Sequence, residues 1–276
     1  MKDSMTLSKL ERLVEKRNLT PAQLHAVIDR LQTQEYVEHR VKHHWGARHV
    51  RFGLLGDTHI GSRYADYGVL NDLFKRFKAE GAECVYHAGD ITEGYGRRKG
   101  HTFECDLHGV DEQVAGVVER FPDVGLKTFF ITGDHDRWHF DSAGVDIGKM
   151  ISEKRKDLKY LGPDAATIEL TKDATIELLH PATGTAYAIS YKPQKIAEAM
   201  SGGEKPAILA IGHFHKIEYL FYRSIHIFQT GTTERQTNWM RRMNISAHLG
   251  GWLLDVHFRR NAQIDRVDMK LFPYYS

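Results

Sequence analysis

The fold of this chain is indicated by residues 129–136, which read Phe129-Phe130-Ile131-Thr132-Gly133-Asp134-His135-Asp136. A run of β-favouring apolar residues ends at a glycine, and three side chains that can bind metal or move protons follow at once. Four further apolar runs end in Asp or His, in the segments Leu54–His59, Val85–Asp90, Ile176–His180 and Leu209–His215. Burying so many titratable groups at strand ends is costly, and a pair of divalent cations would offset that cost.

The composition is that of an ordinary globular protein. The 276 residues suffice for one large α/β domain with a small appendage, and the 17 histidines stand out because histidine is the commonest metal-binding side chain. Cys84 and Cys105 form no C-x-x-C motif, so we expect no disulfide framework. The N-terminus lacks a signal-peptide apolar region and no run approaches a membrane span, so we expect a cytoplasmic protein without membrane contact.

Residues 1–48 are expected to form a helical appendage. Two amphipathic helices separated by Thr20-Pro21-Ala22-Gln23, followed by a strand at Glu35–Val41, resemble a small or truncated winged helix-turn-helix. Nine Lys or Arg against six Asp or Glu would suit a polyanion. The alternative is an arm that packs on the main domain or on a second subunit of a homo-oligomer, because so small a charge excess is common on solvated faces.

From residue 49 to residue 276 the pattern predicts the main domain. We expect alternating strands and helices at Val50–Leu55, Tyr67–Glu80, Cys84–Ala88, Asp106–Arg120 and Lys127–Thr132. This alternation implies a parallel sheet whose functional loops lie at the carboxyl ends of its strands. Beyond Leu158 we expect one helix, Pro193–Met200, and strands at Thr167–Leu170, Thr175–Leu179, Ala186–Ser190, Ala207–Ile211, Glu218–Tyr222, His226–Gln229 and Gly251–Phe258.

The Asp and His clusters, taken in order, resemble the signature of the calcineurin-like metallophosphoesterase family, which is D-x-H, G-D, G-N-H-[DE], H and G-H-x-H. The matching residues here are Asp57-x-His59, Gly89-Asp90, Gly133-Asp134-His135-Asp136, His180 and Gly212-His213-x-His215. The resemblance covers about Val50 to His215. It implies an α/β fold, a β-sandwich of two mixed sheets flanked by helices, and a site for two divalent metal ions, with Mn favoured over Fe, Zn, Mg or Ni.

The resemblance also implies roles for individual residues. One metal would be held by Asp57, His59 and His215, the second by Asp134, His180 and His213, and Asp90 would bridge both. His135 would face the phosphate with Asp136 behind it as an orienting partner. The family has Asn where this chain has Asp134. A carboxylate still ligates, but its extra charge should favour harder cations such as Mn or Mg and weaken the attraction of an anionic substrate.

Phosphoester cleavage follows from such a site. Two cations about 3.5–4 Å apart bind the non-bridging phosphoryl oxygens and lower the pKa of a shared water, so that a metal-bound hydroxide attacks in line. His135, as imidazolium, would stabilise the developing charge or protonate the leaving oxygen.

The loop after Gly89-Asp90 supplies candidate substrate contacts, namely Tyr95, Arg97, Arg98, Lys99 and His101. Three consecutive cations beside a metal site would follow a nucleic-acid backbone and Tyr95 would stack on a base, whereas the alternative is a solvated loop. Additional phosphate contacts are possible at Lys192, Lys195, Arg235, Arg241 and Arg242, and the rings of Trp138, Tyr191 and Trp239 offer flat faces unless they belong to the core.

The stretch Gly89–Gly96 also resembles the corresponding part of the small, exonucleolytic subunit of archaeal family D DNA polymerases, and double-strand-break repair nucleases share the same core pattern. We therefore expect a two-metal phosphodiesterase, a nuclease acting on DNA. One alternative is a phosphodiesterase or phosphomonoesterase acting on small nucleotides or phosphoproteins. Another is a non-catalytic nucleic-acid-binding or scaffold subunit. The side chains at all seven ligand positions can bind metal, which argues against this second alternative.

Overall fold

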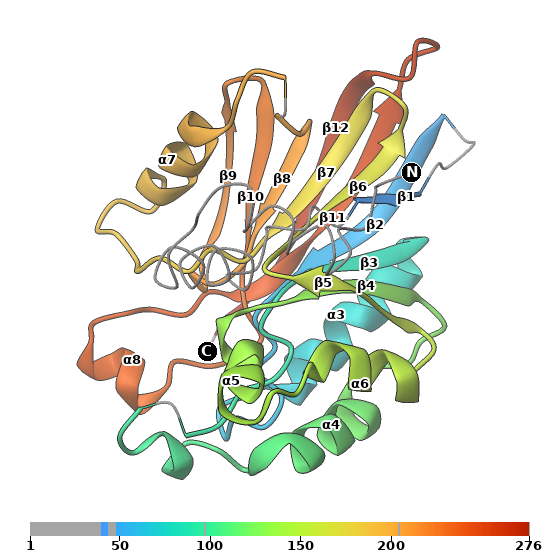
Figure 1. Cartoon of the computed structure of the whole chain (residues 1–276). Helices are drawn as coiled ribbons and strands as arrows, with labels where there is room; N and C mark the ends of the chain where they lie inside the picture. The colour runs from blue at the N-terminus through green and yellow to red at the C-terminus, as the bar shows by residue number, and fades with distance from the viewer. Residues whose placement is uncertain (1–39, 44–47, 97, 204, 276) are drawn as a thin grey trace, which may run out of the picture. The chain divides into compact units, whose positions relative to one another are not determined.

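The computed structural model describes residues 40–43, 48–96, 98–203 and 205–275 (Figure 1). The two helices expected near the N-terminus, and most of the strand expected at Glu35–Val41, lie outside these residues. The described end of that strand belongs to β1, Arg40–Lys42, which pairs in parallel with β6. Among the described residues, no helix has the length and apolar character needed to cross a membrane.

Two mixed sheets, each with six strands among the described residues, form the centre of the fold. The first has the order β1-β6-β7-β8-β10-β9 and the second β12-β11-β2-β3-β4-β5. The first comprises β6 (Ala165–Thr171), β7 (Ala174–Leu179), β8 (Ile208–Ile211), β9 (Ile217–Tyr222) and β10 (Ile225–Thr230) besides β1. The second comprises β2 (His49–Leu55), β3 (Cys84–Ala88), β4 (Lys127–Thr132), β5 (Leu158–Pro163), β11 (Leu249–Phe258) and β12 (Ile264–Tyr274).

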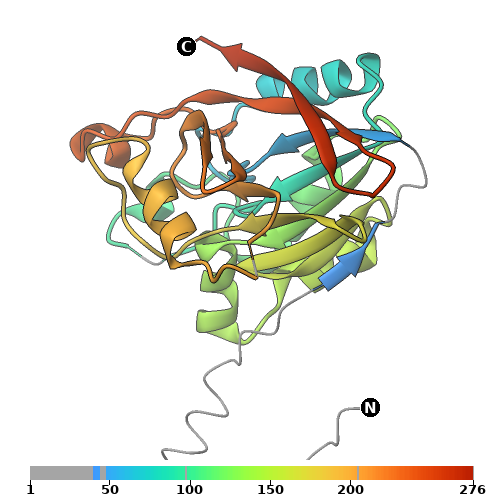
Figure 2. The same ribbon diagram turned by 90° about the horizontal axis from the view of Figure 1, so that it is seen from above.

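The second sheet contains the parallel unit that the sequence predicts. Strands β2 to β5 are parallel to their neighbours, and β11 and β12 extend the sheet with antiparallel pairs. The connections run through α3 (Tyr67–Ala79), the 3₁₀ turn η1 (His101–Phe103), α4 (Gly109–Arg120), α5 (Asp134–Ala143) and α6 (Ile147–Lys154). Figures 1 and 2 show α3 beside the second sheet, with α7 (Tyr191–Ala199) at the other sheet.

Alternation along the strands divides the core into layers. In β2, Phe52 and Leu54 join the cluster between the sheets, which also contains Tyr86 of β3 and Ile176 of β7. Leu55 points the other way, into the cluster that packs under α3, α4 and α6. A third cluster, which includes Ala197, Leu209, Ile211, Ile225 and Ile227, lies between α7 and the first sheet. Because successive side chains point to opposite faces, both faces of β2 are buried.

Most expected elements are present within a few residues of their predicted ends, and the expected α/β sandwich is confirmed. The prediction of a strand at Ala186–Ser190 is wrong. Its apolar alternation leads into α7, where the Tyr191 amide donates to the Ala188 carbonyl and Gln194 donates to Ser190. Elements that the sequence did not indicate include α5, α6, β5, β12 and α8 (Asn238–Arg242).

Candidate metal centre

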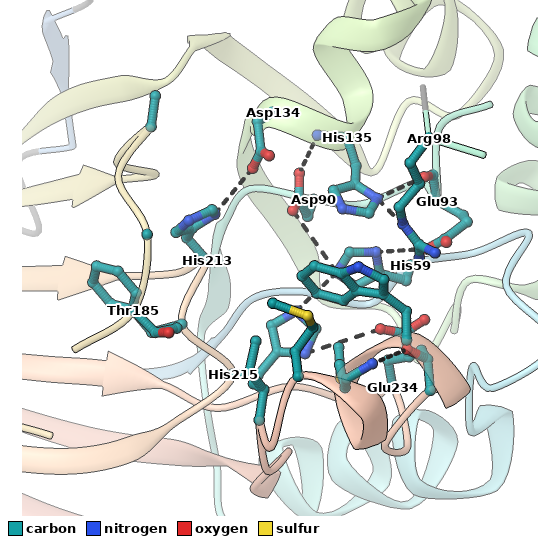
Figure 3. A pocket seen from close by; sticks show the side chains of 18 of the residues that line it. His59, Asp90, Glu93, Arg98, Asp134, His135, Thr185, His213, His215 and Glu234 are labelled. Carbon is teal, nitrogen blue, oxygen red and sulfur yellow. Dashed lines mark hydrogen bonds and ion pairs between the residues drawn. The ribbon is translucent and has the colours of Figure 1, made fainter. Parts of the chain in front are cut away.

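The candidate ligands come together because the ends of five strands meet at one edge of the sandwich. Figure 3 shows His59, Asp90, Asp134, His213 and His215 around the same pocket. Asp57 follows β2, Asp90 follows β3 and Asp134 begins α5 directly after β4. His180 follows β7 of the other sheet, and the loop after β8 carries both His213 and His215. The parallel arrangement of β2, β3 and β4 thus delivers three carboxylates to the place where the first sheet delivers three imidazoles.

The side chains form two groups, and within each group all the potential ligand atoms lie within 4.8 Å of one another. One group comprises Asp57, His59 and His215, and the other comprises Asp90, Asp134, His180 and His213. Asp90 Oδ2 lies 3.1 Å from His180 Nε2 and 3.8 Å from His59 Nε2, so the Asp90 carboxylate is near both groups. The structure therefore brings together the side chains that the sequence pattern grouped.

The imidazoles are oriented as metal-binding imidazoles commonly are. His59 Nδ1 donates to the Glu93 carboxylate at 2.8 Å, and His180 Nδ1 donates to the Ala88 carbonyl at 2.8 Å. His213 Nε2 donates to the Thr183 carbonyl at 2.8 Å. In each ring the nitrogen left without a proton faces the carboxylates of the site, as a metal ligand requires.

His215 completes the first group in an unusual setting. Its Nε2 lies 3.0 Å from His59 Nε2 and 3.5 Å from the Asp57 carboxylate. Its Nδ1 is buried without a hydrogen-bond partner among the described residues. Two ring nitrogens that both act as acceptors repel each other at this distance, and a cation between them and Asp57 would turn that repulsion into ligation. The donor set therefore fits a divalent metal.

The carboxylates of this site are costly to bury. Burial raises the pKa of Asp57 to about 7, and the negative charge of Asp90 acts in the same direction, although nearby imidazoles oppose both. The Asp57 carboxylate also accepts the backbone N–H of His213, at 2.9 and 3.0 Å from its two oxygens. A nearby dication would keep Asp57 ionised, which is what ligation needs.

Backbone strain is concentrated at the same residues. Five of the seven candidate ligands have a positive φ: Asp57 (53°), His59 (45°), Asp90 (53°), His213 (76°) and His215 (53°). Residues other than glycine rarely adopt this conformation, and it costs of order 1–3 kcal/mol at each position. Such strain persists when the surrounding structure requires it. Here the positive φ values turn the backbone sharply after the strands, so that the candidate ligands point toward one another.

His135 lies beside these groups, but its partner differs from the one expected. Its Nδ1 donates to the Glu93 carbonyl at 2.7 Å and lies 3.6 Å from the Glu93 carboxylate. The Asp136 carboxylate instead accepts the backbone N–H groups of Ile91, Thr92 and Gly133. The prediction that Asp136 orients His135 is therefore wrong. Asp136 lies at the third position of α5, where a carboxylate is drawn to the free N–H groups of a helix start.

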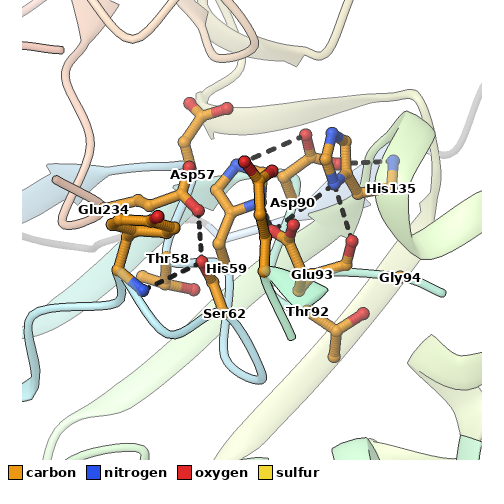
Figure 4. Close-up of polar contacts among 12 residues, drawn as sticks. Asp57, Thr58, His59, Ser62, Asp90, Thr92, Glu93, Gly94, His135 and Glu234 are labelled. Atoms are coloured by element: carbon orange, nitrogen blue, oxygen red, sulfur yellow. Dashed lines mark hydrogen bonds and ion pairs between the residues drawn. The ribbon is translucent and has the colours of Figure 1, made fainter. Parts of the chain in front are cut away.

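Glu93 is the residue that the sequence reasoning missed (Figure 4). It is buried, and its carboxylate binds His59 Nδ1 at 2.8 Å and His101 Nε2 at 2.6 Å while its carbonyl holds His135. A signal was present, since an acidic residue three positions after Asp90 follows the buried Ile91 and Thr92. Such a residue needs cationic or N–H partners nearby.

The basic loop after Asp90 divides into different environments. Lys99 and Tyr95 are exposed, and Tyr95 packs edge-on against His108, whereas Arg97 lies outside the described residues. Arg98 lines the pocket and forms an ion pair with Glu104 at 2.7 Å. His101 is fully buried against Glu93, so the prediction that it contacts substrate is wrong. Its neighbours in the sequence are cationic, but η1 turns its ring inward.

The metal-ligand groups open into a cavity of about 610 Å³, within the range of small-molecule sites. Its polar part includes His59, Asp90, Asp134, His135, His213, His215 and Glu234. Its apolar part is formed by Trp138, Phe214, Trp239, Met240, Met243 and Ile245. Figure 3 shows Arg98 and Glu93 on one side of the pocket and His213 and Thr185 on the other. A substrate would thus meet the polar cluster and an aromatic wall together.

Comparison with known proteins identifies the family. A model of the calcineurin-like phosphoesterase superfamily domain matches residues 50–243. The chain belongs to this superfamily. The resemblance seen in the sequence is therefore confirmed, and phosphoester hydrolysis is the chemistry of this superfamily. The phosphoesterase match includes all seven candidate ligands as well as His135.

Relatives of this phosphoesterase include the DNA polymerase II small subunits of two Halobacterium salinarum strains, each 23% identical over 237 residues. These matches cover 72% of this chain but 46% of each relative, so the chain spans less than half the length of these subunits. Among solved structures, a 5′-nucleotidase precursor from Thermus thermophilus has a TM-score of 0.46 at 12% identity and covers 82% of this chain and 54% of that one. Vacuolar protein sorting 29 from Cryptosporidium parvum has a TM-score of 0.42 at 13% identity, covering 83% and 100%.

Proposed function

We propose that this phosphoesterase is a metal-dependent phosphodiesterase that cleaves DNA. The observation that carries the proposal is the pair of ligand groups with Asp90 near both, each of which contributes side chains to the cavity that His135 also lines. Asp57, His59 and His215 would hold one divalent ion, and Asp134, His180 and His213 the other, with Asp90 shared. When bound, the two ions supply Lewis acidity that binds phosphoryl oxygens and lowers the pKa of an attacking water.

The protein's own residues would position and protonate the substrate. His135 donates through Nδ1 to the Glu93 carbonyl, so the other edge of its ring is available to the cavity that it lines. Burial would lower the pKa of His135, but the charges of Asp90 and Glu93 outweigh this and raise it to about 9. With Nδ1 held by Glu93 and the ring lining the cavity, His135 is placed to give a proton to the leaving oxygen from Nε2.

Two features favour DNA over a small phosphate ester. The cavity wall carries Arg98 and two tryptophans, a combination suited to a phosphate chain with bases attached. Relatives named as DNA polymerase II small subunits match 72% of the chain. Mn²⁺ is the proposed ion, because oxygen ligands from three aspartates combine with imidazoles in a mixed set that suits it.

The proposal is tested with purified protein supplied with Mn²⁺, Mg²⁺, Zn²⁺ or Ni²⁺ and offered labelled single- and double-stranded DNA, RNA, and chromogenic mono- and diesters. We expect cleavage of DNA and of the diester, both abolished by a chelator. His135→Ala should abolish turnover while metal content stays near normal. The matched control is His108→Ala, because His108 lies outside the cavity lining and outside both ligand groups.

Other outcomes would assign other functions. Hydrolysis of small nucleotides or phosphoproteins without cleavage of DNA would show that the protein is a phosphodiesterase or phosphomonoesterase for those substrates and not a nuclease. Metal uptake without turnover of any ester would indicate a binding or scaffold role. Loss of metal together with loss of turnover in His135→Ala would contradict the separate role given to His135.

A further inference from the structure

The apolar wall of the cavity, which contrasts with the polar metal centre, is formed by α8 and the residues that follow it. Trp239 and Met240 belong to this five-residue helix, and Met243 and Ile245 follow it in the chain. Met240 is buried and anchors the helix, whereas Trp239 remains 39% exposed and Met243 is exposed as well. A large ring that borders an active-site cavity and keeps this much exposed surface has room for a further packing partner.

Trp239 is held in place from two sides. Its backbone N–H donates to the Glu104 carboxylate at 3.1 Å, and the same carboxylate pairs with Arg98 at 2.7 Å. The Arg98 guanidinium lies over the indole ring, 5.0 Å from its centroid. Glu104 thus fixes the backbone at Trp239 and the cation that lies over its ring, and the contact with Arg98 restrains the indole at the cavity.

Cationic side chains accompany this ring. Arg241 and Arg242 lie on the same helix and are exposed, and within the part of the chain that the structure describes neither side chain has a hydrogen bond or ion pair. Arg98 lines the cavity itself, whereas Arg241 and Arg242 lie on α8 outside the cavity lining. A fixed flat ring combined with available guanidinium groups matches the chemistry of a polyanion that carries aromatic groups, which is that of a nucleic acid strand.

We propose that the α8 wall is a base-stacking subsite, in which Trp239 packs against an unpaired nucleobase next to the scissile phosphate while Arg241 and Arg242 contact neighbouring phosphates. This inference rests on the proposed function and specifies its substrate. A base within a duplex has both faces covered by its neighbours, so Trp239 can stack only on a base of a single strand or a frayed end. The enzyme should therefore prefer single-stranded DNA to duplex.

The test uses the full chain loaded with Mn²⁺ and fluorescence anisotropy of a labelled single-stranded oligonucleotide, in the His135→Ala background so that the strand is not cut. Trp239→Ala should weaken binding by about 5- to 150-fold, which is the effect of losing one stacked base. Trp239→Phe, which keeps a flat ring, should recover most of the loss, and Trp239→Leu, which keeps only apolar bulk, should not.

Two controls separate stacking from general damage. Phe221→Ala removes another exposed aromatic ring, on β9 and outside the cavity lining, and should leave binding unchanged. An oligonucleotide of abasic residues keeps the phosphates but has no bases, so Trp239→Ala should no longer affect its binding. Equal losses with normal and abasic strands, or unchanged binding of the normal strand, would overturn the subsite.

Cleavage by the otherwise unaltered enzyme distinguishes this inference from the function on which it rests. If DNA is cut but Trp239→Ala binds and cleaves normally, the stacking subsite is refuted and the nuclease stands. If a chromogenic diester is hydrolysed while DNA is neither bound nor cut, both the nuclease and the subsite are refuted. A duplex cut as fast as its single strand would also contradict the stacking inference.

Discussion

Replacing Glu93 by Gln should weaken the metal centre although it replaces none of the candidate ligands. In the folded protein the Glu93 carboxylate accepts from His59 Nδ1 at 2.8 Å and from His101 Nε2 at 2.6 Å, and it is buried. Glutamine is nearly isosteric, but it has one acceptor oxygen where two are needed, and its amide N–H₂ would face an imidazole N–H. One charge-assisted hydrogen bond is lost and a donor is left facing a donor.

The magnitude follows from those contacts. A hydrogen bond to a charged group contributes about 1.5–3 kcal/mol, and breaking a buried charge pair costs about 3–5 kcal/mol. We therefore expect Glu93→Gln to lower the free energy of unfolding by roughly 2–4 kcal/mol. Because His59 loses the partner that fixes its tautomer, affinity for one divalent ion and turnover should fall about 10- to 100-fold.

The assay combines a Mn²⁺ titration by calorimetry, steady-state hydrolysis of a diester and urea unfolding. Glu119→Gln, the same chemical change at an exposed position of α4, is the matched control and should alter none of the three quantities. Unchanged metal affinity and unchanged turnover in Glu93→Gln would refute the idea that Glu93 supports the centre. Reduced stability alone would limit Glu93 to a structural role.

Three further predictions concern the centre and its surroundings. A Cβ added at Gly133 would lie 2.3 Å from Asp90 Oδ1, so Gly133→Ala should shift that carboxylate by about 1 Å and reduce turnover about 100-fold. Gly203→Ala, whose added Cβ would meet open space, is the control and should leave turnover unchanged. Normal kinetics in Gly133→Ala would contradict this geometry. Asp134→Asn removes a negative charge from the cavity, which reduces the repulsion of the anionic strand and should lower the KM for DNA several-fold. The KM is measured at two salt concentrations, because salt screens this repulsion, and a higher KM in the variant would contradict the electrostatic origin of the effect. Burial lowers the pKa of His139 to about 4, below its unfolded value of about 6.5. The free energy of unfolding should therefore be unaffected by this group above pH 6.5 and fall by up to about 1.4 kcal/mol per pH unit as the pH drops from 6.5 toward 4. Urea unfolding in EDTA should show a shallower pH dependence in His139→Gln than in the unaltered protein, and identical slopes would refute this role of His139.

The sequence predicted those parts of the fold that depend on local periodicity. Strands Cys84–Ala88 and Lys127–Thr132 end where the pattern placed them, because apolar runs between turn residues specify buried parallel strands. Helix α5 was not indicated, since its sequence Asp-His-Asp-Arg-Trp-His-Phe-Asp-Ser-Ala has almost no apolar stripe. Asp136 accepts the N–H of Gly133 at the start of this helix and also the N–H of Ile91 in the loop after β3, and the second contact is tertiary.

The site shows the same division. Side chains at strand ends could be grouped from the sequence, because parallel strands deliver their carboxyl ends to one edge. The partners of those side chains could not. Glu93 and Asp136 are both acidic and both near the motif, and only the three-dimensional course of the loops after β3 and β4 decides that Glu93 supports His135 and Asp136 caps α5. The side chain of His101 turns inward for the same reason.

If the two ligand groups hold two divalent ions, the number of metal ions bound per chain is fixed and can be counted. The protein is saturated with Mn²⁺, freed of loose ions by gel filtration and measured by inductively coupled plasma mass spectrometry. We predict two ions per chain, one in a variant that carries both His180→Ala and His213→Ala, and one in a variant that carries both Asp57→Ala and His215→Ala. A chain that retains no divalent ion, or double variants that still hold two, would contradict a centre built from these two ligand groups.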